Sequence, residues 1–320
     1  MIPFPGKLFL RSSMASKDAA GIKALTGAVR LKTTARVKEL YYDLFFTYKN
    51  LDLIKNRAAL FSGIENAALA RYSTGMATQQ EVLMAQTEKY MVLEKEAMLN
   101  QKIQALEAML NTVVGRDVNS PLGRPREITP AVFPYEMNDL IKMAHDNSPE
   151  IKAQNQMIEA AETKISMAEK EYYPDFTVTA NYFAKNKFYQ DMWGLTTTIN
   201  IPIFYKTKQR QAVLEAQSMH SEADHELKAM ELMLAAAIRD NYSMIKTSEK
   251  LMALYKDALV PKTHQDFESG LSGYAAGKVE AMTVISRLKS LIDYETLYWQ
   301  QFTEREKAIA RLEAITAVSQ

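Results

Sequence analysis

The sequence predicts a mainly α-helical protein with a small β part, in which long antiparallel coiled-coil helical hairpins are joined to one β-hairpin. Three observations support this prediction. A short phrase occurs twice between long helical patterns, apolar residues recur at heptad spacing along one helix, and one stretch alternates apolar with polar residues. The repeated phrase is the most informative of them, because internal repetition sets the architecture before any motif is interpreted.

The repeated phrase occupies residues 72–83 and 274–285. Each copy begins Tyr-x-x-Gly and places an apolar pair at the same distance after the glycine. Each copy also lies between two helical patterns, so we expect it to form the tip of a helical hairpin, with Gly75 and Gly277 at the turn. The chain is therefore predicted to be a tandem duplication of one long hairpin.

Weaker internal sequence similarity extends the duplication beyond the two tips, and the chain is accordingly predicted to have three parts. Residues 1–117 form a first repeat, which we expect to begin partway through its pattern, near the end of a strand. Residues 118–147 are rich in proline and form a connector that ends in a short helix. Residues 148–320 form a complete second repeat, which consists of a helix, a β-hairpin at about 175–204 and a second helical hairpin.

Heptad spacing predicts two packing stripes on the helix that follows the first tip. One stripe consists of Ala85, Val92, Leu99, Leu106 and Val113, and the other of Met84, Met91, Met98 and Ala105. Thioether sulfurs also favour soft metal ions, so a metal path is the alternative for the methionines. We interpret the methionines as packing residues, because methionine is a common gap-filler at such positions.

The second repeat opens with a helix start and continues into the β-hairpin. Ser148 is predicted to cap the helix, with Pro149 at its first position. Residues 175–183 and 193–203 alternate apolar residues with Thr and Asn, and residues 185–191 form a polar connection. Strands of this length can cross a bilayer when they are tilted, and the Thr and Asn face suits a water-filled lumen.

Composition excludes several classes of function. The net charge of +1 gives no basis for nucleic-acid binding, and the absence of cysteine excludes disulfides and thiol catalysis. The start of the chain carries no signal-peptide pattern, and no apolar run is long enough for a transmembrane helix. No enzymatic or cofactor-binding motif occurs. The histidines are too scattered to predict a metal site.

In an ordered set of motifs the chain resembles the TolC family of outer-membrane efflux proteins, and the resemblance covers nearly the whole sequence. The motifs are Arg71-Tyr72-x-x-Gly75, Gly273-Tyr274-x-x-Gly277-Lys278-Val279, Asn147-Ser148-Pro149-Glu150-Ile151, Tyr173-Pro174-Asp175-Phe176 and Ile199-x-Ile201-Pro202-Ile203-Phe204. The resemblance implies a homotrimer whose β-hairpins build a transmembrane β-barrel in the outer membrane of a Gram-negative bacterium. It also implies that the helical part lies in the periplasm and that an upstream portion of the family pattern is missing.

The resemblance further implies partners and site residues. The partners are a periplasmic adaptor protein, an inner-membrane pump and outer-membrane lipid, with no cofactor. The hairpin tips would dock the adaptor through Arg71, Tyr72, Gly75, Met76, Ala77, Tyr274, Gly277, Lys278 and Val279. The alternative interpretation is that the glycines only permit the turns and the tyrosines pack beneath them.

Two further groups of residues are candidates by the same resemblance. Asp266 and Glu268 precede the second tip, where acidic side chains repeated by threefold symmetry would ring a closed periplasmic mouth and favour cations. A solvated helix face is the competing interpretation. Tyr182, Tyr189 and Trp193 stand near the strand ends and are expected at the membrane interface, although ordinary sheet aromatics would follow the same pattern.

Two hypotheses of function remain. The first is a passive exit duct for tripartite efflux or secretion, which has no turnover of its own. The second is a soluble coiled-coil scaffold that joins other proteins and transports nothing. The predicted β-hairpin separates them, because a soluble scaffold has no use for an apolar strand face that alternates with a threonine face.

Overall fold

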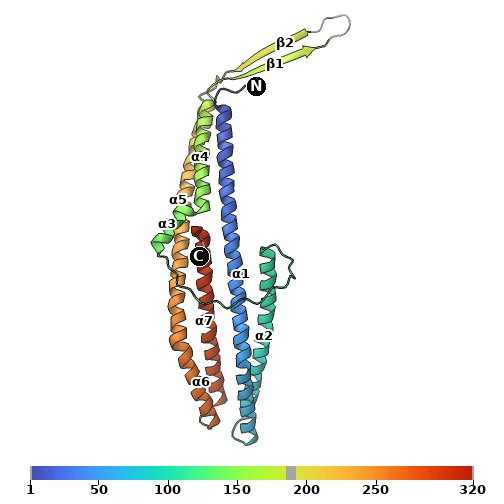
Figure 1. Cartoon of the computed structure of the whole chain (residues 1–320), viewed down its shortest axis with the longest axis vertical. Helices are drawn as coiled ribbons and strands as arrows, with labels where there is room; N and C mark the ends of the chain where they lie inside the picture. The colour runs from blue at the N-terminus through green and yellow to red at the C-terminus, as the bar shows by residue number, and fades with distance from the viewer. Residues whose placement is uncertain (1, 185–191, 319–320) are drawn as a thin grey trace. The chain divides into compact units, whose positions relative to one another are not determined.

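The computed structural model describes residues 2–184 and 192–318 and is mainly helical, with one β-hairpin (Figure 1). The predicted fold class is confirmed. In chain order the elements are α1 (Lys7–Ser73), α2 (Gln79–Val113), α3 (Met137–Asn147), α4 (Pro149–Lys170), β1 (Asp175–Phe183), β2 (Met192–Asn200), α5 (Gln209–Leu254), a π-helical turn (Tyr255–Leu259), α6 (Val260–Ala275) and α7 (Ala281–Thr316). Among the described residues, no helix is both long enough and apolar enough to cross a membrane.

The chain divides into two compact units, and each unit is built from two separate stretches. The first unit comprises Met1–Arg30 and Ile141–Ala236, and the second comprises Leu31–Leu140 and Ala237–Gln320. Each unit therefore takes part of its chain from the first predicted repeat and part from the second. The helices α1 and α5 each contribute residues to both units.

The first unit packs the start of α1 against α4 and the first part of α5. Its core contains small side chains such as Ala153, Ala160 and Ala216, which allow the helices to approach closely. Gly21 serves the same purpose, because a Cβ at this position would lie 3.6 Å from the backbone oxygen of Ala153. The result is a narrow bundle that carries the β-hairpin at one end (Figure 1).

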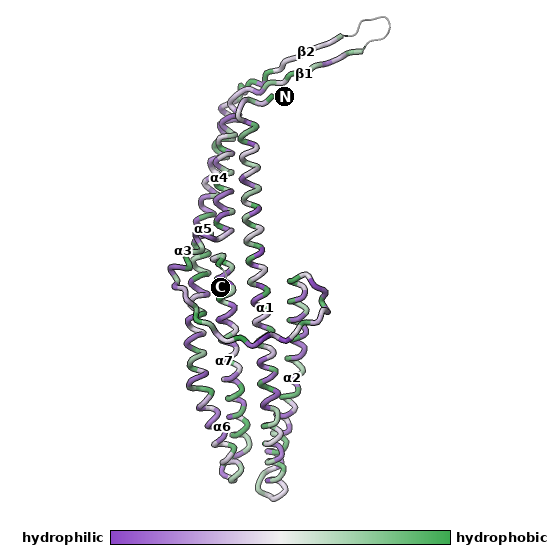
Figure 2. Tube along the Cα trace, viewed as in Figure 1, coloured by the Kyte–Doolittle hydropathy of each residue, from purple (hydrophilic) through white to green (hydrophobic). Residues whose placement is uncertain are grey.

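The β-hairpin pairs β1 with β2 in antiparallel register. Partners in this register share a face, so one face is mainly apolar. The other face carries mainly threonine and asparagine and ends in the apolar pair Phe183 and Met192. The apolar face contains Phe176 with Ile199, Val178 with Thr197, Ala180 with Leu195, and Tyr182 with Trp193. Figure 2 shows apolar residues recurring along both strands.

The second strand ends earlier than the sequence predicts. We expected residues 193–203, whereas β2 ends at Asn200. Pro202 has no N–H to donate to a ladder, and the chain turns from Ile203 onward toward α5. The alternating pattern continues past the true strand end because Ile201 and Ile203 remain apolar after pairing has stopped.

The second unit contains two helical hairpins, one formed by α1 and α2 and the other by the α5–α6 arm and α7. A single hydrophobic cluster joins both hairpins near their tips, and Ile64, Ala68 and Val82 meet Val284 and Leu288 within it. Of the predicted first stripe, Ala85, Val92 and Leu106 are buried, and Leu99 and Val113 pack against the core from partly buried positions.

The prediction that the methionine stripe is core is wrong for two of its members. Met91 is 47% exposed and Met98 is 65% exposed. In a heptad the two stripes lie side by side on the helix but point in different directions. Within the described residues, the core covers the first stripe and Met84 of the second, while Met91 and Met98 stay exposed. Spacing alone therefore identified two candidate seams and could not tell which one the chain itself covers.

The structure also corrects two local predictions, one about a helix cap and one about the continuity of a helix. Ser148 makes no side-chain capping hydrogen bond; its backbone N–H donates to Ala144 O at 2.9 Å, so it extends the preceding helix. Pro149 does stand at the first helical position. The arm predicted as one helix from 208 to 261 contains a π-helical turn at Tyr255–Leu259, which ends two residues before Pro261. The missing N–H of Pro261 disrupts the regular ladder of helical hydrogen bonds.

Candidate functional site

The two hairpin tips are turns of the same kind. Gly75 has φ +73° and Gly277 has φ +74°, the left-handed conformation that glycine adopts most readily. At each tip the glycine N–H donates to the carbonyl of the preceding tyrosine at 3.0 Å. The next N–H, of Met76 or Lys278, reaches back five residues at 2.8 Å, which completes a Schellman motif. The repeated Tyr-x-x-Gly phrase thus encodes a helix stop, as predicted.

The equivalent tyrosines of the two tips lie in different environments. Tyr72 is 47% exposed, whereas Tyr274 is 1% exposed and belongs to the core cluster. The Tyr274 hydroxyl and the Glu81 Oε2 atom are both buried without a hydrogen-bond partner among the described residues. Burial and the charge of Glu81 raise the pKa of Tyr274, while Arg71 opposes this shift. The interpretation that tyrosine packs beneath the turn therefore holds for Tyr274 and not for Tyr72.

Arg71 connects one tip to the other. Its Nη1 donates a 2.6 Å hydrogen bond to the carbonyl of Tyr274, and its guanidinium lies 4.6 Å from the centre of that ring. Its Nη2 donates to the carbonyl of Met76 at 3.2 Å within its own turn. One side chain therefore fixes the first tip and attaches it to the second.

The remaining tip residues divide by exposure. Met76 is 71% exposed, and Gly75, Gly277 and Lys278 also face solvent. Ala77 and Val279 are partly buried. Val279 packs against the core cluster, and its methyl group would lie 2.7 Å from a Cβ placed at Gly273. The exposed tip surface is thus smaller than the predicted docking set.

The candidate gate acids lie on α6 and are largely solvent-accessible. Asp266 pairs with Arg287 of α7 at 3.2 Å, and Arg287 also donates to the Asp266 carbonyl at 3.2 Å. Glu268 lies 3.6 Å from His264, one turn away. Sequence reasoning missed Arg287, although a cation of α7 opposite an acid of α6 is the signal that could have found it. Arg287 also packs against Gly270, where a Cβ would lie 2.7 Å from the guanidinium.

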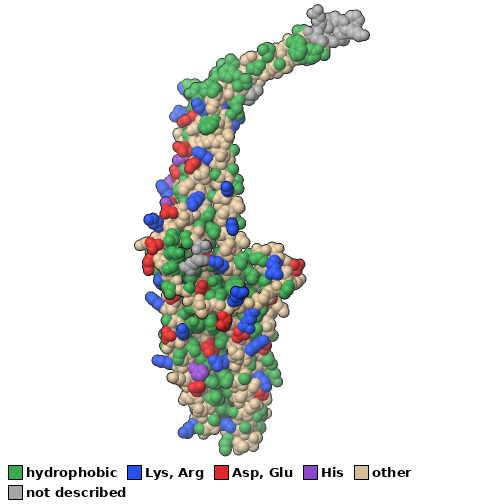
Figure 3. Space-filling model, in the orientation of Figure 1, with side chains coloured by type: hydrophobic (Ala, Val, Ile, Leu, Met, Phe, Trp, Pro, Cys, Tyr) green, Lys and Arg blue, Asp and Glu red, His purple; other side chains and the backbone are tan. Residues whose placement is uncertain are grey.

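The predicted interface aromatics lie on the β-hairpin of the first unit. Tyr182 and Trp193 are cross-strand partners whose ring centres are 4.5 Å apart, with exposures of 51% and 79%. Tyr189, the third candidate, lies outside the described residues. After Asp175, the described residues of both strands carry no charge, while Lys, Arg, Asp and Glu are scattered over the helices (Figure 3).

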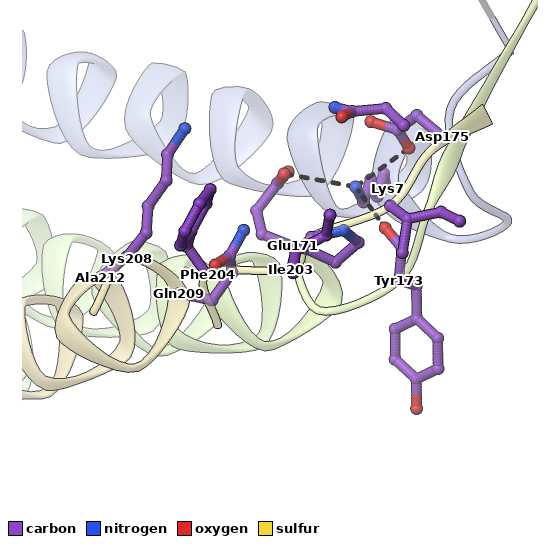
Figure 4. Close-up of a pocket in the computed structure, with 12 residues that line it drawn as sticks. Lys7, Glu171, Tyr173, Asp175, Ile203, Phe204, Lys208, Gln209 and Ala212 are labelled. Atoms are coloured by element: carbon purple, nitrogen blue, oxygen red, sulfur yellow. Dashed lines mark hydrogen bonds and ion pairs between the residues drawn. The ribbon is translucent and has the colours of Figure 1, made fainter. Parts of the chain in front are cut away.

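A buried lysine joins the base of the hairpin to α1, and sequence reasoning did not single it out. Lys7 is 1% exposed and pairs with Asp175 at 3.0 Å and with Glu171 at 3.3 Å (Figure 4). It also donates to the carbonyl of Tyr173 at 3.3 Å. The Phe4 N–H donates to Asp175 Oδ1 at 2.8 Å. These bonds fix the direction in which the strand leaves the bundle.

The described residues contain no group of three or more His, Cys, Asp or Glu side chains that could hold a metal ion. The predicted site residues lie at two places in the structure. The hairpin tips in the second unit carry the docking and gating candidates, and the hairpin in the first unit carries the aromatics.

The chain thus combines two long helical hairpins, turned by matching glycine tips, with a β-hairpin that carries no charge after Asp175 in its described residues. The profile of the outer membrane efflux protein family matches residues 140–315. The chain belongs to this family.

Curated relatives agree with this assignment. The probable outer membrane lipoprotein SilC of Salmonella typhimurium is 23% identical over 308 residues, which cover 91% of this chain and 64% of SilC. The cobalt-zinc-cadmium resistance protein CzcC of Cupriavidus metallidurans is 19% identical over 297 residues, which cover 93% of this chain and 70% of CzcC. The chain thus spans about two thirds of the length of these relatives.

Solved structures show the same fold. The outer membrane protein VceC of Vibrio cholerae matches with a TM-score of 0.85 at 17% identity, over 98% of this chain and 76% of VceC. CusC, whose structures concern folding and transmembrane channel formation, matches with a TM-score of 0.84 at 14% identity, over 98% of this chain and 74% of CusC. At these identities the likeness concerns the fold.

Proposed function

We propose that the chain is one protomer of a passive exit duct in the outer membrane of a Gram-negative bacterium. The single observation that supports this most strongly is the β-hairpin, whose apolar face is exposed in the chain. Val178, Leu195 and Trp193 are 47%, 74% and 79% exposed on that face. Such a face is stable in contact with lipid and unfavourable in contact with water.

The assembly is a homotrimer in this proposal. One hairpin cannot close a sheet, so copies of the chain must supply the missing neighbours. The exposed stripe of Met91 and Met98 gives the hairpin of α1 and α2 an apolar side that another copy can cover. The tips would meet a periplasmic adaptor protein, and an inner-membrane pump would energise export, as the family relationship supports.

The duct itself performs no turnover, and its cargo is set elsewhere. Relatives carry names that refer to cobalt, zinc and cadmium resistance and to multidrug resistance, so one fold serves different cargo classes. A wide water-filled path offers few contacts to a passing solute. Substrate choice therefore belongs to the pump.

The test is localisation together with function in a Gram-negative host that lacks its own efflux duct. The chain should appear in the outer-membrane fraction, cross-link as a trimer and, with its adaptor and pump, restore resistance to a pump substrate. Recovery in the soluble fraction as a helical protein would favour the coiled-coil scaffold instead. Outer-membrane location without restored export would contradict the duct.

A further inference from the structure

The junction where the β-hairpin meets α5 in the first unit combines exposed apolar residues with unpaired cations. We name this surface the junction collar. It consists of Ile203, Phe204, Tyr205, Lys206, Lys208 and Arg210. Figure 3 shows hydrophobic side chains gathered at the base of the hairpin, with Lys and Arg side chains close by on the helices.

The collar is a defined turn, not a loose segment. The N–H groups of Thr207 and Lys208 donate to the Phe204 carbonyl at 3.2 and 3.0 Å, and the Arg210 N–H donates to the Tyr205 carbonyl at 2.9 Å. This winding leads directly into α5. Phe204 and Ile203 are nevertheless 75% and 76% exposed, so the ordered backbone holds apolar side chains in solvent.

The cations of the collar have no neutralising partner in the part of the chain that the structure describes. Lys206, Lys208 and Arg210 are exposed, and none makes an ion pair or side-chain hydrogen bond with another described residue. The carboxylates at the same junction, Glu171 and Asp175, are both engaged by the buried Lys7. In the sequence, residues 201–206 (Ile-Pro-Ile-Phe-Tyr-Lys) resemble residues 2–7 (Ile-Pro-Phe-Pro-Gly-Lys), and this similarity aligns Lys7 with Lys206. Lys7 is buried and paired, whereas Lys206 is exposed and has no ion-pair partner among the described residues.

The α1 side of the junction repeats the combination of aromatic rings and positive charge. Phe4 and Tyr173 stack with ring centres 4.5 Å apart, and Lys170 Nζ lies 5.7 and 5.3 Å from the two rings. Phe9 is 75% exposed beside them, and Arg11 follows it. The same chemistry thus occurs on both chain segments that lead into the hairpin.

We propose that the junction collar binds the phosphate groups of acidic phospholipids in the membrane leaflet from which the helices project, an inference that rests on the proposed function. Aromatic and aliphatic side chains favour the headgroup depth of a bilayer, and lysine and arginine beside them bind anionic phosphodiesters. A soluble anion would neutralise the cations and leave Ile203 and Phe204 in water. A lipid neutralises the cations and also covers Ile203 and Phe204.

The test compares two matched charge variants of the full chain. The collar variant carries Lys206→Gln, Lys208→Gln and Arg210→Gln. The control variant carries Lys228→Gln, Lys250→Gln and Lys262→Gln, which remove the same charge from exposed lysines of the α5–α6 arm that have no ion-pair partner among the described residues. Circular dichroism verifies that both variants keep the native helix content.

Binding is measured by flotation with vesicles of phosphatidylcholine alone and of phosphatidylcholine and phosphatidylglycerol in equal parts. The native chain and the control variant should prefer the acidic vesicles, and high salt should weaken that preference. The collar variant should lose about tenfold or more of its partition into acidic vesicles while it keeps its partition into neutral ones.

Specific results would overturn the proposal. Equal binding of the native chain to both vesicles, or an equal loss in the control variant, would remove the collar as a lipid site. Suppression of the preference by inorganic phosphate at matched ionic strength would identify a soluble anion as the ligand. A chain that reaches the outer membrane in cells without preferring acidic vesicles overturns only the collar, whereas absence from the outer membrane overturns the proposed function.

Discussion

The guanidinium of Arg71 lies 4.6 Å above the ring of Tyr274 and donates a 2.6 Å hydrogen bond to the backbone carbonyl of that residue. The same carbonyl accepts the N–H of Gly277 at 3.0 Å, so both of its lone pairs are used. One bond of the second turn and the Arg71 hydrogen bond to the first tip therefore share one oxygen atom. This sharing makes the tips a coupled pair.

Arg71→Ala should loosen the two tips relative to each other. The substitution removes the hydrogen bond between the tips and the cation–π contact but leaves both Schellman turns intact. Because the chain has no cysteine, spin labels can be placed at Thr74→Cys and Ala276→Cys alone. Double electron–electron resonance should show a broader distance distribution in the Arg71 variant.

The matched control for this experiment is Arg116→Ala. Arg116 lies beside the left-handed Gly115 at another helix end, and among the described residues its side chain donates only to the Pro121 carbonyl of its own loop, at 3.4 Å. This variant should leave the distance distribution between the tips unchanged. Identical distributions in the native chain and the Arg71 variant would show that the core cluster alone holds the tips together.

Alanine at either tip glycine should destabilise the chain through backbone conformation alone. Gly75→Ala and Gly277→Ala should each cost about 1 kcal/mol, because an L-residue is disfavoured at φ near +73°. No atom lies within 4 Å of a Cβ built at either position, so a steric clash does not contribute. Urea unfolding followed by circular dichroism measures the loss.

Gly63→Ala is the control for the tip glycines. Gly63 lies inside α1, and its Cβ would also meet no atom within 4 Å. Since alanine is the better helix former, this variant should gain about 0.5–1 kcal/mol. Destabilisation by Gly63→Ala, or stabilisation by Gly277→Ala, would show that the described backbone angles do not determine these effects.

The sequence was sufficient where structure is local. A glycine just after the end of a helical pattern specifies a turn through its own φ, as Gly75 and Gly277 do. Alternation along 175–183 specifies a strand through the direction of successive side chains. Both predictions therefore needed no knowledge of neighbours. The heptad stripe of Ala85 and Val92 belongs to the same category, because the helix period determines which residues share a face.

The sequence was insufficient where the outcome depends on what packs against a residue. Tyr72 and Tyr274 occupy equivalent places in the repeated phrase, yet only Tyr274 is buried. Lys7 and Lys206 are equivalent in the same sense, and only Lys7 meets carboxylates. A repeated sequence phrase predicts that both copies form the same local turn. It does not predict which side chains pack against each copy, because those come from elsewhere in the chain.

Glu306 should make the second unit less stable as the pH rises. Burial raises the pKa of this carboxyl above its ordinary value of 4.5, and nearby Glu313 adds to the rise, while Arg305 and a hydrogen bond from Tyr42 oppose it. Arg305 itself is also held by Glu249 at 3.0 Å. The folded state thus binds the proton more tightly than the unfolded state does. The resulting stability is fully present below pH 4.5 and is lost as the pH rises through the raised pKa.

Glu306→Gln should abolish this part of the pH dependence. The variant should be at least as stable as the native chain at neutral pH, because it no longer buries that charge and Arg305 keeps Glu249. Thermal unfolding midpoints measured between acidic and neutral pH show how stability depends on pH. Glu304→Gln, on the same helix beside Lys307, is the control and should keep the pH dependence of the native chain. A strong loss of stability in Glu306→Gln at neutral pH would show that the ion pair with Arg305 dominates over burial.

Trp193 should report directly on the environment of the hairpin. The chain contains two tryptophans, so Trp299→Phe leaves Trp193 as the only one. Trp193 is 79% exposed and packs on one side against Tyr182, at 4.5 Å between ring centres. If the hairpin enters a bilayer, transfer from detergent-free buffer to lipid vesicles should shift its emission to shorter wavelength. Lipids brominated near the headgroup should quench this emission more than lipids brominated at the chain ends, since tryptophan favours the interface.

The converse variant, Trp193→Phe, is the control. It retains Trp299 against Phe45 and Phe302 in the second unit, and its emission should not change with lipid. An equal response of both variants, or none in either, would place the hairpin outside the membrane.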